Sequence, residues 1–133
     1  MNQQNRRLNI AEEMDESAVA LSDAELLLAN GRYQGATTRA YYAAFHALQA
    51  LLLTKGLEAK SHHGVAYLFR LHFVKTQIID SKYSQILART QKYREEADYH
   101  HTMEFSQTQA EDTLREVKEL IVALEKQIRN HLK

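Results

Sequence analysis

The sequence predicts an all-α fold: an up-and-down four-helix bundle with one additional short helix. The chain of 133 residues has no proline and only four glycines, so few turns are obligatory. Apolar residues recur at spacings of three and four along most of the chain, the pattern of a helix with one buried face. Strand-like alternation of apolar and polar residues does not extend beyond a few positions. Long helices joined by short loops are therefore expected.

The first two helices are predicted from residues 8–30 and 36–53. The first ends at Asn30 and Gly31, a pair that favours a left-handed turn. The second is apolar on nearly all sides, so we expect it in the middle of the bundle. At this length one domain is expected, residues 1–133, with residues 1–7 as a frayed N-terminus.

The remaining helices are predicted from residues that can cap their N-terminal ends. Ser61 can cap a short third helix, and either Asp80 or Ser81 can cap a fourth. Ser106 and Gln109 have the spacing of a capping box, which would open an amphipathic last helix.

Composition limits the function. Seventeen Lys and Arg residues balance seventeen Asp and Glu residues, so the formal net charge is zero at pH 7. This argues against a strongly basic nucleic-acid platform and predicts weak binding of long RNA. The absence of cysteine excludes disulfides and thiolate metal sites. Because neither a secretory signal nor an apolar run of about 18 residues is present, we expect a cytoplasmic protein without a membrane partner.

The second helix carries a polar stripe, the first candidate site. Arg39, Tyr42, His46 and Gln49 fall within a sector of about 80° on a helical wheel. A cation, a phenol and an imidazole in one line could hold a phosphate or act as acid and base. The same side chains could instead pair with carboxylates of neighbouring helices or line a dimer interface, since buried polar groups are usually hydrogen-bonded.

A second candidate lies in residues 93–101. On a continuing helix Arg94, Asp98 and His101 share one side, whereas His100 points elsewhere. An arginine that stabilises a phosphorane and a histidine that moves a proton would suffice for metal-free RNA cleavage by the substrate's own 2′-hydroxyl. The alternative is an intrahelical Arg94–Asp98 pair followed by solvated histidines.

A third candidate begins at Ser61. His62, His63, His100 and His101 raise the question of a metal site, because imidazole is a common metal ligand. Adjacent histidines point to different faces of a helix, however, and no carboxylate stands at the spacing of a known metal motif. We therefore expect no metal and no cofactor. Ser61 as a cap, with free backbone amides that could bind an anion, is the simpler interpretation.

Three segments together resemble the HEPN family (higher eukaryotes and prokaryotes nucleotide-binding domain), and within it the small stand-alone prokaryotic members. They are ANGRYQGATTRAYYAAFHALQALLLTKG at residues 29–56, KSHHGVAYLF at residues 60–69 and YREEADYHH at residues 93–101. The resemblance spans residues 8–132. It implies a helical bundle that forms a homodimer. Many such members are encoded beside a minimal nucleotidyltransferase and act with it as a toxin–antitoxin pair.

The resemblance also implies which residues would carry an activity. Catalytically active members are metal-independent ribonucleases with an Arg-x(4–6)-His motif, two copies of which meet across the dimer. Here Arg94 and His100 form Arg-x(5)-His, while Arg94 and His101 form Arg-x(6)-His. We therefore expect a component of a toxin–antitoxin or defence module that acts as an endoribonuclease, with Asp98 orienting the site.

The chain also departs from the family pattern. In one branch a tyrosine two residues after the motif histidine receives AMP, but Thr102 and Met103 stand at those positions, and Tyr99 is the only near substitute. The alternative is a non-catalytic module that binds a nucleotide or regulates a nucleotidyltransferase partner. Its site, or else a structural polar seam, would comprise Arg39, Tyr42, His46, Ser61 and His62. In either case we expect Asp98 or Tyr99 within hydrogen-bonding reach of the polar stripe.

Overall fold

The computed structural model describes residues 2–100 and 104–132, and the regular structure within them is entirely helical. This confirms the predicted all-α bundle of four long helices and one short helix. The helices are α1 (Gln3–Ala29), α2 (Tyr33–Thr54), α3 (His62–Phe69), α4 (Ser81–Glu95) and α5 (Gln107–Leu132). Two π-helical turns, η1 (Arg70–Val74) and η2 (Glu96–His100), continue α3 and α4.

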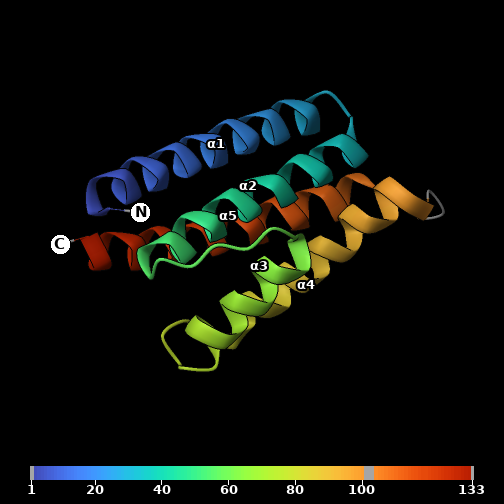
Figure 1. Ribbon diagram of the computed structural model, residues 1–133. Coiled ribbons are helices and arrows are strands. Elements are labelled where there is room, and N and C mark those ends of the chain that lie inside the picture. Colours follow the sequence, from blue (N-terminus) through green and yellow to red (C-terminus); the bar gives the residue numbers. More distant parts are fainter. Residues whose placement is uncertain (1, 101–103, 133) are drawn as a thin grey trace.

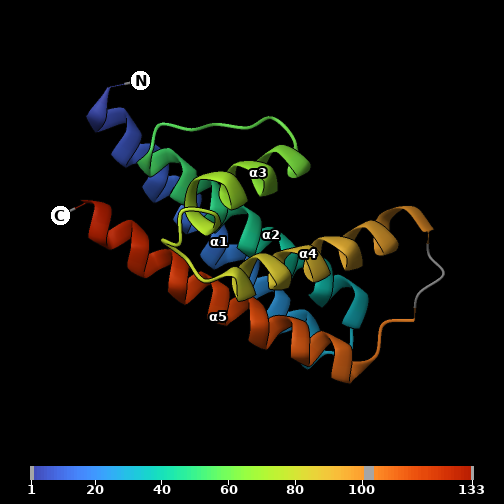
Figure 2. The same cartoon turned by 90° about the horizontal axis from the view of Figure 1, so that it is seen from below.

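Helix α2 lies in the middle of the bundle (Figures 1 and 2). It contacts α1, α3, α4 and α5, and α1 lies on the opposite side of α2 from the pair formed by α3 and α4. The first turns of α1 meet the last turn of α5, where the Arg7 guanidinium donates to the carbonyl of Leu132 at 3.3 Å. The polar stripe of α2 can therefore meet partners from both sides of the bundle.

The helix ends follow the predicted caps. Ser61, Asp80 and Ser106 each accept a hydrogen bond from a backbone N–H two or three residues later, at 2.8 to 3.1 Å. Gly31 has a positive φ of 74° in the tight turn between α1 and α2, as expected. Helix α1 begins earlier than expected, because Asn2 caps it and it is helical from Gln3. The residues expected to be frayed are thus mostly helical.

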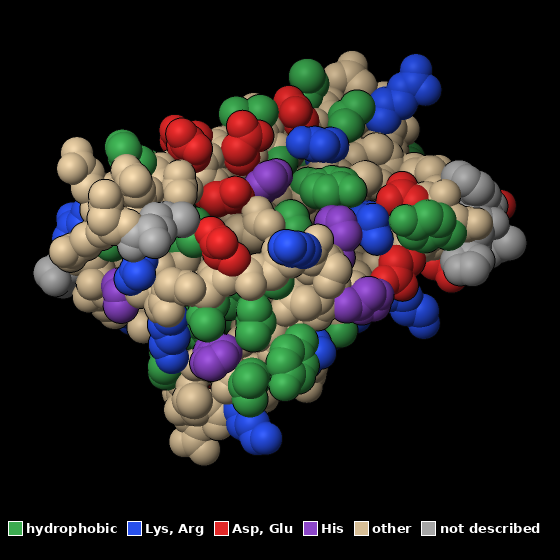
Figure 3. Space-filling model, in the orientation of Figure 1, with side chains coloured by type: hydrophobic (Ala, Val, Ile, Leu, Met, Phe, Trp, Pro, Cys, Tyr) green, Lys and Arg blue, Asp and Glu red, His purple; other side chains and the backbone are tan. Residues whose placement is uncertain are grey.

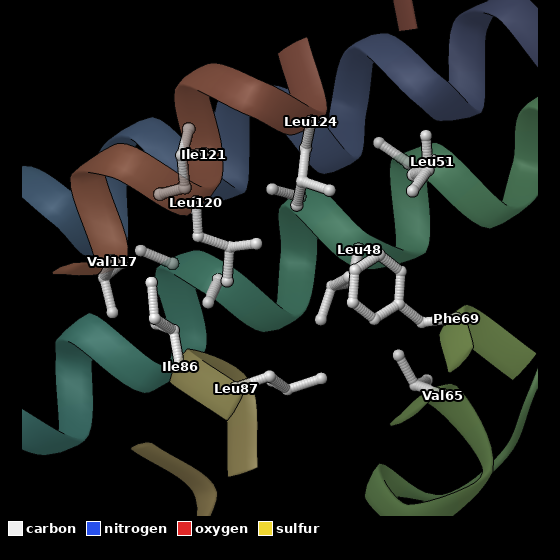
Figure 4. Packing of buried hydrophobic residues seen from close by; sticks show 14 of the residues in the cluster. Leu48, Leu51, Val65, Phe69, Ile86, Leu87, Val117, Leu120, Ile121 and Leu124 are labelled. Carbon is white, nitrogen blue, oxygen red and sulfur yellow. The ribbon is translucent and has the colours of Figure 1, made fainter. Parts of the chain in front are cut away.

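Burial of α2 forms the core. Thirteen of its 22 residues are buried, as the nearly all-apolar composition predicted. Its alanines bring the neighbouring helices close, and its leucines fill the space between them. Figure 4 shows leucines of this helix packed against side chains from α3, α4 and α5. Those labelled are Leu48, Leu51, Val65, Phe69, Ile86, Leu87, Val117, Leu120, Ile121 and Leu124.

The core predicts a large loss of stability on truncation of Leu48. This side chain is fully buried, so Leu48→Ala removes apolar contacts and leaves a cavity. We expect the free energy of unfolding, measured by urea titration, to fall by about 2–5 kcal/mol. The control is Val122→Ala, since Val122 is 64% exposed, and it should change stability by less than about 0.5 kcal/mol. Similar losses in both variants would contradict the core assignment.

Candidate functional site

The polar stripe of α2 divides into two halves that face different helices. His46 Nδ1 lies 2.8 Å from Glu13 Oε2 of α1. The Gln49 amide, in the orientation that satisfies both groups, donates to the same carboxylate at 2.9 and 3.2 Å. This half therefore forms a hydrogen-bonded link between α2 and α1, as the structural interpretation of the stripe predicted.

The other half faces α4. The Arg39 guanidinium lies over the Tyr42 ring, 5.4 Å from its centroid, and the Tyr42 phenol in turn raises the pKa of Arg94. Arg94 itself lies over the ring of Tyr41, 5.4 Å from its centroid. Two neighbouring tyrosines of α2 thus contact two arginines of different helices.

Arg94 is buried although it is charged, with only 7% of its surface exposed. Its Nη1 atom lies 3.3 Å from Asp98 Oδ2, and the Tyr99 ring centroid lies 5.8 Å from the guanidinium carbon. The buried Nε atom has no hydrogen-bond partner within the described residues. Burial acts to lower the pKa of Arg94, but the Tyr42 and Tyr41 phenols and the Asp98 carboxylate outweigh it, so the pKa is raised and the side chain stays charged.

A shallow hollow of about 600 Å³ lies over Arg94, between the start of α3 and the end of α4. Figure 3 shows histidine side chains gathered beside basic and acidic ones on this face of the molecule. The hollow combines a cation at its floor with polar groups of both signs around it. Its lining residues are Lys60, Ser61, His62, His63, Arg94, Glu95 and Tyr99.

His62 is held in this hollow by aromatic residues of α2. Its Nδ1 atom lies 2.7 Å from the Tyr41 hydroxyl, and its ring centroid lies 4.5 Å from that of Phe45. Burial raises the pKa of Tyr41, which is 1% exposed. Burial lowers the pKa of His62, and the nearby positive charge of Arg94 lowers it further. Both groups are therefore neutral at pH 7.

The rim of the hollow is more exposed. The His63 side chain is 84% exposed, and its Nε2 atom lies 3.5 Å from Glu95 Oε1. Gln91 contacts both residues, at 3.3 Å from His63 Nδ1 and 3.5 Å from Glu95 Oε1. Side chains of His63, Gln91 and Glu95 therefore link the two sides of the hollow.

The residues predicted near the end of α4 are placed only in part. Arg94 and Asp98 form the expected pair, and η2 replaces the expected α-helical continuation. His100 belongs to the backbone of η2, but its side chain and the whole of His101 lie outside the described part of the structure. Thr102 and Met103 also lie outside it.

The expected link between the stripe and this segment exists in a different form. No hydrogen bond of the described residues joins Asp98 or Tyr99 to the stripe. Arg94 instead lies close enough to Tyr42 for that phenol to raise the pKa of the arginine. A second link joins α2 to η2, where the Gln34 amide donates to the carbonyl of Ala97 at 3.3 Å.

Tyr41 was missed as a site residue because its position on the wheel is apolar. The sequence also did not predict that Glu13 contacts His46 or that Glu95 contacts His63, because these contacts join residues far apart in the chain. A signal existed for Glu13, because a buried polar stripe requires partners on a neighbouring helix.

The zero net charge hides a separation of charge between the two sides of α2. Six acidic residues and no Lys or Arg lie between positions 8 and 30, most of α1. Eight Lys or Arg and five acidic residues lie between positions 55 and 100, which include α3, α4 and η2. The side of the bundle that carries the hollow is therefore the basic side. Acidic side chains follow α1 in Figure 3.

Two other properties of the described residues bear on function. Residues 2–100 and 104–132 contain no group of three or more His, Cys, Asp and Glu side chains arranged to hold a metal ion. The same residues include no helix that is long and apolar enough to cross a membrane.

Fold and site define a small helical bundle in which a buried arginine lies beneath a histidine-lined hollow. The chain belongs to the HEPN domain family, whose model matches residues 9–127. It is 38% identical over 108 residues to a "UPF0332 protein" of Thermotoga maritima, covering 81% of this chain and 82% of that protein.

Other relatives agree. The chain is 38% identical over 112 residues to a protein of Methanocaldococcus jannaschii named "Putative toxin MJ0605", covering 84% of this chain and 83% of that protein. The crystal structure of TT1696 from Thermus thermophilus has a TM-score of 0.75 and 20% identity, covering 89% of this chain and 97% of that one. The latter shows the same fold.

The lowered pKa of His62 predicts how its substitution changes the response to acid. Because this pKa lies below the ordinary value of 6.5, the unfolded chain takes up the proton at higher pH than the folded chain does. The folded state therefore loses stability as the pH falls through the ordinary value. Between about pH 7.5 and about pH 5.5, the free energy of unfolding should fall more in the wild type than in His62→Gln. Equal falls in urea titrations would show that the pKa of His62 is not lowered.

Proposed function

We propose that this chain is the toxin-like component of a prokaryotic toxin–antitoxin or defence module, and that it binds and cleaves RNA at the hollow over Arg94 without a metal ion. The observation that supports this most is the burial of a charged arginine beneath a basic hollow, because such a cation is suited to a phosphate. The name of the Methanocaldococcus relative contains the word toxin, which supports the cellular role.

The proposed reaction is transfer within the RNA itself. The 2′-hydroxyl attacks the neighbouring phosphorus, the bond to the 5′-oxygen breaks, and the products are a 2′,3′-cyclic phosphate and a 5′-hydroxyl. A base takes the proton of the 2′-hydroxyl and an acid returns one to the leaving oxygen. Arg94 would stabilise the charge on the phosphorane, while His100 or His101 would transfer the proton. Asp98 would hold the guanidinium through its ion pair.

The separation of charge supports RNA as the ligand. The segment between positions 55 and 100 carries eight basic and five acidic residues, so phosphates can be neutralised on this side even though the whole chain is neutral. We extend the proposal to a homodimer, in which two such sites act together, and to a minimal nucleotidyltransferase as the antitoxin partner. Membership of the family supports both.

A second candidate function is nucleotide binding without cleavage, in a module that regulates its partner. The burial of Arg94 favours this function. Asp98 and Tyr99 contact its guanidinium, and the residue is only 7% exposed, so an RNA phosphate has little direct access to it. Arg39 and His46 do not line the hollow, so the nucleotide would bind through Lys60, Ser61 and His62.

RNA cleavage in EDTA tests the first function. Purified wild-type protein should release fragments that end in 2′,3′-cyclic phosphate, and Arg94→Ala should lower the rate roughly 100- to 1,000-fold, because it removes a charge that stabilises the transition state. Arg129→Ala is the matched control, since Arg129 is an exposed arginine of α5, and it should cleave at the wild-type rate. An inactive wild type, or equal rates for the two variants, would refute the proposed reaction.

Calorimetric titration with 5′-AMP tests the second function. Binding without cleavage of any RNA would favour it, and Lys60→Ala should then weaken binding because it removes a positive charge from the hollow. Lys126→Ala changes an exposed lysine of α5 and should leave the affinity unchanged. If Lys60→Ala binds 5′-AMP as tightly as the wild type, the hollow is not the nucleotide site.

A further inference from the structure

The imidazole ring of His62 is held by several contacts although it lines an open hollow. The ring is hydrogen-bonded through Nδ1 to Tyr41 at 2.7 Å, and its centroid lies 4.5 Å from that of Phe45 and 5.9 Å from that of Tyr42. Three aromatic side chains of α2 thus hold one imidazole of α3. Its orientation is set before any ligand arrives.

The hydrogen bond to Tyr41 determines which nitrogen of His62 carries the proton. Tyr41 is 1% exposed and keeps its phenolic proton at neutral pH, because burial raises its pKa. Within the described residues, His62 Nδ1 is the one hydrogen-bond partner of the Tyr41 hydroxyl. The hydroxyl therefore donates and Nδ1 accepts. A neutral imidazole that accepts at Nδ1 must carry its hydrogen on Nε2.

The Nε2–H group remains available for a ligand. It makes no hydrogen bond to the described residues, and it is not among their buried unpartnered atoms. His62 lines the same hollow as Lys60 and Arg94. A donor with a fixed direction thus shares the hollow with two cations.

We propose that His62 binds a phosphate oxygen of the ligand through its Nε2–H group, and that Tyr41 is a positioning residue that holds the imidazole in this tautomer. The inference rests on the proposed function, because it places a phosphate in the hollow over Arg94. It specifies the atom through which His62 would bind, a neutral donor beside the cations already assigned there, and it adds Tyr41 as the residue that orients it. The ligand class is a phosphate ester, either the diester of RNA or the monoester of a nucleotide.

The charges around His62 determine the direction in which its pKa should change when a ligand binds. Arg94 of α4 and His63 of α3 lower the pKa of His62, while Glu95 of α4 and Asp98 of η2 raise it. Tyr41 of α2 faces the ring as a neutral phenol. A bound phosphate adds negative charge beside Nε2, so the pKa of His62 should rise when the hollow is occupied.

Nitrogen-15 NMR of the imidazole rings tests the tautomer in the full chain. At neutral pH the His62 signals should show hydrogen on Nε2 and an unprotonated Nδ1. In Tyr41→Phe, which keeps the ring but removes the hydroxyl, the tautomer with hydrogen on Nδ1 should become populated. Hydrogen on Nδ1 in the wild type would overturn the proposal, whatever the protein does to RNA.

Calorimetric titrations with inorganic phosphate, 5′-AMP and the dinucleotide ApU then test binding. His62→Ala should bind the preferred ligand roughly tenfold more weakly or worse, as expected for loss of a hydrogen bond to a charged group. Tyr41→Phe should lie between it and the wild type. His131→Ala, which changes an exposed histidine of α5, should bind like the wild type. Tighter binding of ApU would indicate the diester, and tighter binding of 5′-AMP the monoester.

The outcomes separate this inference from the function on which it rests. If Arg94→Ala binds weakly and His62→Ala binds like the wild type, the inference is wrong and the proposed site remains. If the folded wild type binds none of the three ligands, both are wrong. Thermal unfolding of each variant shows whether a loss of binding reflects a loss of folding.

Discussion

Helix α2 contacts all four other helices, so most polar groups that it buries need a partner inside the protein. A buried polar atom without a hydrogen-bond partner destabilises the folded state, because it has lost its hydrogen bonds to water. The helix meets this constraint on two sides. In its C-terminal half, His46 and Gln49 form hydrogen bonds with the carboxylate of Glu13. Its N-terminal half gives Tyr41 and Tyr42 to α3 and α4.

The candidate site depends on the contacts that Tyr41 and Tyr42 of α2 make with α3 and α4. Arg94 can be buried in a charged state because aromatic rings, a phenol and a carboxylate surround it. His62 is drawn into the same arrangement through Tyr41, which is part of the core. The hollow is therefore lined by groups whose positions are set by the packing of α2. Such preorganisation is what binding and catalysis both require.

The parts of the structure that depend on local interactions were predictable from the sequence. A capping serine such as Ser61 bonds an amide three residues away, so its role can be inferred from a short segment. The partners of the stripe could not be inferred, since Glu13 and Arg94 lie far from α2 in the sequence. The π-helical end of α4 was also missed, because η2 is only five residues long and so short a segment does not reveal a change in the apolar periodicity. The role of Tyr41 could not be inferred either. The apolar residues around it in the sequence predict that it is buried, but they do not show that its hydroxyl contacts His62.

The separation of acidic α1 from basic α4 and the basic segments that flank α3 gives this neutral protein an electric dipole across the bundle. A polyanion that approaches from the α1 side is repelled, and the torque on the molecule turns the opposite side towards it. Encounters would thus be oriented before contact, and their rate would fall as salt screens the field over about 10 Å. A chain without net charge can in this way present two sides that differ in electrostatic potential.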